Sequence, residues 1–84
     1  MSHAQKERED LAKAEADITA GEKRVSEQIA LIERLTAVGH DLTEAEKLLQ
    51  NYNQTLVEFQ RHRQIILDEI ARQEGPEPQH TPIP

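Results

Sequence analysis

Apolar residues recur every seven positions through the first half of the chain, and a second series follows them three residues later. The predicted contact positions of this half are Leu11, Ile18, Gly21, Val25, Ile32 and Leu35, together with Ala14 and Gln28. This spacing places all of them on one face of a long α-helix, as in a coiled coil. We therefore predict a first helix over residues from about 3 to 38.

The second half of the chain repeats this pattern over a similar length. Its predicted contact positions are Leu49, Tyr52, Leu56, Phe59, Ile66 and Ile70, in series with Ala45 and Arg63. The pattern predicts a second helix over about 43–74. Gly39 suits a left-handed helix end, and Asp41 or Thr43 can cap the next helix, each with a glutamate three residues later, so the turn is expected at 39–42.

A short turn between two long helices makes them antiparallel neighbours. The expected fold class is therefore all-α, an antiparallel two-helix hairpin over residues 1–74. In the expected register Gly21 faces Phe59, which gives a glycine inside a helix a packing reason. The same register places Gln28 beside Tyr52 and Asn53, and Ile18 beside Arg63, with Asp17 as a salt partner for Arg63.

Some apolar residues lie off these two contact faces and have no partner within a single hairpin. They are Leu31, Val38, Leu48, Val57, Ile65 and Leu67. A second copy of the hairpin would cover them and form a four-helix bundle. The sequence thus predicts a homodimer with these residues at the interface.

Composition narrows the class of function. Apolar residues make up 36% of the 84 residues and only two side chains are aromatic, which argues against an enzyme with its own deep pocket and gives no cofactor site. A formal net charge of −6 has the wrong sign for binding nucleic acid. The chain contains no cysteine and no long apolar run, so we expect a cytoplasmic protein without membrane contact.

Two groups of side chains offer candidate chemistry. Glu58 and His62 lie four residues apart, and Glu27 or Glu33 could complete a metal site. Ferritin-like di-iron bundles use a spacing of three on inward positions, so a solvated helix pair is the favoured interpretation and a metal-binding bundle is the less favoured one. His40 and Asp41 could form a catalytic pair, although a carboxylate before a helix is usually a cap.

The segment Arg61-His62-Arg63 is the one basic cluster, and it could receive a phosphate or an acidic partner. The alternative is that Arg63 forms an ion pair across the two helices while Arg61 is solvated. We favour this second interpretation because the chain as a whole is acidic.

Several short segments between about Leu11 and Ile70 resemble those of one group of known proteins. The shared positions are Gly21-Glu22-Lys23-Arg24, Gln28, Leu31-Ile32, Leu35, Gly39-His40-Asp41, Ala45-Glu46, Leu48-Leu49 and His62-Arg63. In these segments the chain resembles small helical-hairpin proteins common in alphaproteobacteria, a group without an assigned activity. The resemblance implies a bacterial, cytoplasmic helical hairpin and supplies no mechanism.

The function expected from these observations is binding. The first hypothesis is a non-catalytic helical module that interacts with another protein as a homodimer. The alternative is an inhibitor of the antitoxin or antisigma type, in which the acidic chain masks a basic partner. The sequence does not identify that partner.

Residues 75–84 contain all four prolines of the chain and are expected to form a disordered tail outside the hairpin. Deleting them should leave the melting temperature of the protein nearly unchanged, because a polar proline-rich segment buries little surface. Thermal unfolding followed by circular dichroism tests this. A melting temperature lower by many degrees would show that the tail packs on the hairpin.

Overall fold

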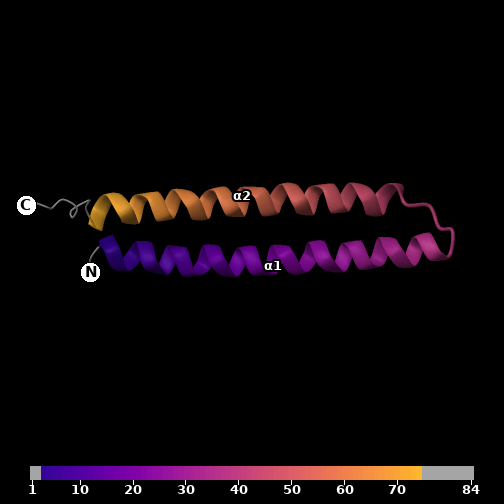
Figure 1. The fold of residues 1–84 in the computed structure, drawn as a ribbon, viewed down its shortest axis with the longest axis horizontal. Coiled ribbons are helices and arrows are strands. Elements are labelled where there is room, and N and C mark those ends of the chain that lie inside the picture. Colours follow the sequence, from indigo (N-terminus) through magenta and orange to yellow (C-terminus); the bar gives the residue numbers. More distant parts are fainter. Residues whose placement is uncertain (1–2, 75–84) are drawn as a thin grey trace, which may run out of the picture.

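The structure of the protein is a computed structural model, and it describes residues 3–74. Two helices, α1 (His3–Ala37) and α2 (Thr43–Glu74), lie side by side in opposite directions along their whole length (Figure 1). The prediction of an all-helical hairpin is confirmed, and there is no strand within residues 3–74. The predicted tail at 75–84 lies outside the described residues.

The end of α1 is fixed by backbone hydrogen bonds around Gly39. The Gly39 N–H donates to the carbonyl of Thr36 at 3.1 Å, and the His40 N–H donates to the carbonyl of Leu35 at 2.9 Å. This pair of bonds defines a Schellman motif, which satisfies carbonyls that the helix end would leave unpaired. Gly39 has a φ of 71°, which glycine adopts without steric strain. The chain therefore leaves α1 at Ala37, one residue before the predicted end.

The start of α2 differs from the predicted capping arrangement. The Leu42 carbonyl accepts the N–H of Glu46 at 2.9 Å, so Leu42 occupies the N-cap position. Asp41 precedes this position, and its carboxylate accepts a hydrogen bond from the Thr43 hydroxyl at 3.0 Å. Glu44 and Glu46 still place negative charge in the first turn of α2, where the helix dipole favours it.

The contact face between α1 and α2 is thin. Among the described residues, the buried apolar side chains are Ala14, which is 2% exposed, and Ile66, which is 5% exposed. The other apolar contact positions, such as Val25 and Phe59, are only half-buried. No described side chain is fully buried, because each helix is covered on one side only.

The helices approach each other closely at Gly21, which is itself buried. A Cβ atom on Gly21 would lie 3.2 Å from Cδ1 of Leu56 and 3.5 Å from Cδ2 of Phe59. The glycine thus leaves room for two large side chains of α2 against the backbone of α1. The structure brings Gly21 and Phe59 together, as the predicted register requires, and adds Leu56 to the same contact.

Two polar contacts of the predicted register take other partners. Gln28 is 6% exposed and its amide nitrogen donates to the backbone carbonyl of Ala45 at 2.8 Å, about two turns nearer the hairpin turn than Tyr52. Arg63 pairs with Glu15 at 3.3 Å, so the prediction of Asp17 as its partner is wrong. Asp17 instead pairs with Lys13 at 3.4 Å, one turn away on the same helix.

Replacing Gly21 with leucine should lower the free energy of unfolding by about 1–3 kcal/mol through overpacking against Leu56, although leucine favours helix more than glycine does. Urea denaturation measures this change. Ala20→Leu is the matched control, because Ala20 is exposed and the same substitution there should be close to neutral. A more stable Gly21→Leu protein would contradict the close approach.

Replacing Gln28 with glutamate should lower the free energy of unfolding by about 1–3 kcal/mol at pH 7, because a carboxylate cannot donate to the Ala45 carbonyl. Only the protonated acid can donate, so the folded state should raise the pKa of the new carboxyl. The deficit relative to the natural chain should therefore shrink as the pH falls from neutral towards about 4.3, the ordinary glutamate pKa that applies in the unfolded state, and stay constant below it. Urea denaturation of both proteins across this pH range tests the prediction, with Gln54→Glu, at an exposed position, as the control. A deficit that does not change with pH would contradict the hydrogen bond between Gln28 and the Ala45 carbonyl.

Candidate functional surface

Five large apolar side chains are exposed on the hairpin, and they are the first candidates for binding. Their exposed fractions are 76% for Val38, 58% for Ile65, 49% for Val57, 44% for Ile29 and 40% for Leu48. Four of these belong to the interface predicted from the sequence. The other two predicted members, Leu31 and Leu67, are half-buried at the edge of the helix contact.

Ile29 is exposed although the sequence analysis did not select it. It directly follows Gln28, whose side chain points into the contact between the helices. One residue along an α-helix corresponds to a rotation of about 100°, which carries Ile29 to the edge of that contact. An apolar residue immediately after a contact position is the sequence signal that could have identified it.

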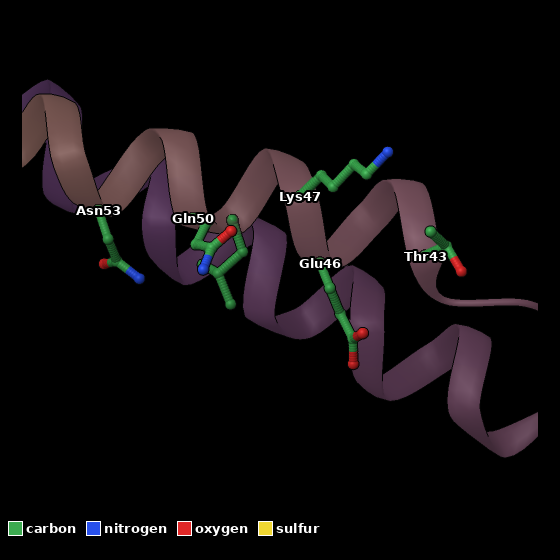
Figure 2. A pocket seen from close by; sticks show the side chains of 6 residues that line it. Thr43, Glu46, Lys47, Gln50 and Asn53 are labelled. Carbon is green, nitrogen blue, oxygen red and sulfur yellow. The ribbon is translucent and has the colours of Figure 1, made fainter.

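One side of the hairpin carries a shallow depression of about 400 Å³ near the turn. Figure 2 shows Asn53, Gln50 and Glu46 projecting from the same side of α2, whereas Lys47 points away from them. Thr43 and Leu49 complete the lining, so all of it comes from α2. Hydroxyl, amide and carboxylate groups on one helix can contact a partner surface, but they do not surround a small substrate.

The other side of the contact has a smaller groove of about 170 Å³. Gly21 and Arg24 line it from α1, and Tyr52 and Thr55 line it from α2. The two hollows therefore mark the two sides along which the contact between α1 and α2 is open to solvent.

Helical geometry divides the predicted interface between these two sides. Val57 and Leu67 follow Gln50 and Asn53 at steps of seven and fourteen residues, so they share the side of the larger depression. Leu48 precedes Thr55 by seven residues and lies on the side of the smaller groove. This geometry divides the six residues into two groups, and their place in a dimer interface stays a prediction.

The remaining members fall on the side of the smaller groove. Leu31 and Val38 follow Arg24 of that groove by seven and fourteen residues along α1. Ile65 follows Thr55 on α2 by steps of three, four and three residues through Glu58 and His62, and this alternation keeps it on the same edge of the helix. A list of apolar residues off the contact face does not by itself distinguish these two sides.

The candidate metal ligands are engaged in ordinary surface contacts. Both carboxylate oxygens of Glu58 accept hydrogen bonds from Arg61, at 2.9 and 3.0 Å, and His62 is exposed. Within the described residues no three His, Asp or Glu side chains gather closely enough to hold a metal ion, so Glu27 and Glu33 do not join Glu58 and His62.

The turn pair and the basic cluster are likewise accounted for by local contacts. The His40 ring places Nδ1 2.8 Å from the backbone carbonyl of Asp41, which accepts a hydrogen bond in the tautomer that carries its proton on Nδ1. The ring thus contacts the Asp41 backbone rather than its carboxylate. In the basic cluster, Arg61 pairs with Glu58 and Arg63 pairs with Glu15, which leaves little free positive charge for a phosphate.

Charged side chains elsewhere form pairs one helical turn apart. Lys6 donates to the Asp10 carboxylate at 3.1 Å, and this hydrogen bond together with the negative charge of Asp10 raises the pKa of the lysine ammonium. Lys23 and Glu27 lie 3.8 Å apart in the same arrangement. Exposed pairs of this kind keep the outer helix faces solvated and support each helix weakly.

Neither described helix has a stretch apolar and long enough to cross a bilayer. Comparison with known proteins gives no match, because no family model fits the chain and no curated protein or solved structure is significantly similar to it. The resemblance to alphaproteobacterial hairpin proteins therefore stays a prediction. Function has to be argued from the hairpin itself.

Proposed function

We propose that this protein is a non-catalytic helical interaction module that works in the cytoplasm as a homodimer, with two hairpins packed into a four-helix bundle. The observation that carries this proposal is the balance of burial. Within the described hairpin, Ala14 and Ile66 are the only buried apolar side chains, whereas five large apolar side chains are exposed.

Conformational entropy opposes folding of such a hairpin by about 1.5 kcal/mol for each ordered residue. The two helices order 35 and 32 residues, and their contact face buries few side chains to offset that term. Packing against a second hairpin removes further apolar surface from water and supplies the missing stabilisation. A two-fold arrangement closes the assembly at two copies, because each hairpin uses the same surface.

The role in the cell is then to bind another protein through the surfaces that dimerisation leaves exposed. A net charge of −6 per chain favours a basic partner through electrostatic steering. The alternative function, an inhibitor of the antitoxin or antisigma type, is a special case in which the dimer masks a basic partner. Capture of partners from cell extract, followed by their identification, separates the two functions, because a dedicated inhibitor should recover one basic partner and a broad binder several.

The dimer itself is tested by size exclusion coupled to light scattering. The expected mass at micromolar concentration is twice the 9.6 kDa of the chain. Because association stabilises only the folded form, the melting temperature should also rise with protein concentration. A monomeric mass with a cooperative, concentration-independent melt would reject the homodimer and leave the exposed apolar groups for a different protein.

A further inference from the structure

One edge of α2 carries a long stripe of uncharged residues. It runs along the edge that carries the larger depression, at alternating steps of three and four residues. Its members are Gln50, Asn53, Val57, Gln60, Gln64 and Leu67, and it ends at Ala71. The spacing is that of one continuous helix face, and six of these seven side chains are exposed, with Leu67 half-buried.

The corresponding stripe on the other edge of α2 has a different character. It passes through Leu48, Thr55 and Ile65 but also holds Glu58, Glu69 and Arg72. Glu58 pairs with Arg61, and Glu69 pairs with Arg72. In a chain whose residues are 31% charged, an uncharged face over six turns of one helix is unusual, and the contrast lies between two edges of the same helix.

Protein interfaces are depleted of charged residues at their centres, because a charge removed from water needs a partner. Amide side chains carry both donors and acceptors, so a face rich in glutamine can pair with a copy of itself. Two acidic chains also repel each other least where neither presents a charge. These properties favour a second copy of this chain as the occupant rather than a basic protein, which would be attracted to carboxylates.

We propose that the uncharged stripe of α2 is the surface on which the second hairpin packs, with the two α2 helices antiparallel across the two-fold axis. An antiparallel register exists in which Val57 meets the partner's Leu67 while Gln60 meets the partner's Gln64. The two-fold axis repeats each of these contacts in the other half of the interface. Apolar groups then face apolar groups, and amides face amides.

The α1 helix contributes to the edge of this surface. Opposite the stripe lie the small residues Thr19 and Ser26, and Ile29, which is 44% exposed. Glu15 lies on the same side, and Arg63 neutralises it at a distance of 3.3 Å. Glu22 and Glu33, which follows Ser26 by seven residues and is exposed, keep their charges at the rim, so the centre of the interface lies on α2.

This inference rests on the proposed homodimer, and two matched substitutions separate the two claims. Val57, 49% exposed, lies on the uncharged stripe, and Ile65, 58% exposed, lies on the charged one. Sedimentation equilibrium of the full chain should show the dimer dissociation constant of Val57→Glu raised about tenfold or more, because it buries an unpaired charge. Ile65→Glu should leave that constant within about twofold of the natural value.

Each outcome decides one claim. If the natural chain is a monomer, the proposed function fails. If it is a dimer that Ile65→Glu weakens and Val57→Glu does not, the charged edge is the interface and the uncharged stripe is excluded. Equal effects of both substitutions, or no effect of either, also overturn the assignment of the stripe while leaving the dimer intact.

A second measurement avoids any loss of folding caused by a new charge. The chain has no cysteine, so Gln60→Cys on the stripe and Gln54→Cys on the outward face each give one thiol, and both positions are exposed in the single hairpin. Labelling of Gln60→Cys by a maleimide should slow severalfold as concentration rises and dimers form, whereas Gln54→Cys should keep its rate. Equal rates at high concentration would contradict the proposal.

Discussion

The structure depends on a single contact face between two helices. Gly21 lets Leu56 and Phe59 pack against the backbone of α1, and the buried amide of Gln28 holds the start of α2 through the Ala45 carbonyl. These contacts set how far apart the helices lie and how they align. They do not create an enclosed core, because a side chain at a two-helix contact has neighbours on one side only.

Because a two-helix contact has no enclosed core, the exposed edges beside it decide how the hairpin can gain further stability. A hairpin with half-buried contact residues gains stability from any partner that covers its edges, and its two edges differ in chemistry. The uncharged edge of α2 favours a copy of the same chain, whereas Leu48 and Ile65 lie among carboxylates on the other edge. One edge can thus serve assembly while the other stays available for a different protein.

Much of the fold could be predicted from the sequence, because heptad spacing and a glycine at position 39 are local signals with few competing interpretations. The features that escaped prediction depend on competition between neighbours. Asp17 pairs with Lys13 one turn away on the same helix and not with Arg63 across the contact. Leu42 occupies the N-cap position, although its neighbours Asp41 and Thr43 are of types that cap helices better. In both cases the alternatives lie within a few residues, and sequence patterns do not rank them.

The candidate surface was predicted less completely. Apolar residues off the contact face can be counted from the sequence. Assigning Val57 and Ile65 to different edges requires the position of each residue around the helix relative to the hollows that Asn53 and Thr55 line. The stripe from Gln50 to Ala71 is recognised as uncharged only after that assignment, because charged residues of the other helix faces lie between its members in the sequence. Function could not be predicted beyond the class of binding, since no motif in the sequence identifies a partner.

The central claim, that one hairpin is insufficient and folding is coupled to association, is tested most directly by dilution. Far-ultraviolet circular dichroism of the natural chain, measured from high micromolar to nanomolar concentration, should show the helical signal falling as the dimer dissociates. The concentration at half-loss should match the dissociation constant from sedimentation. A helical signal that stays constant after the mass has fallen to 9.6 kDa would contradict the account.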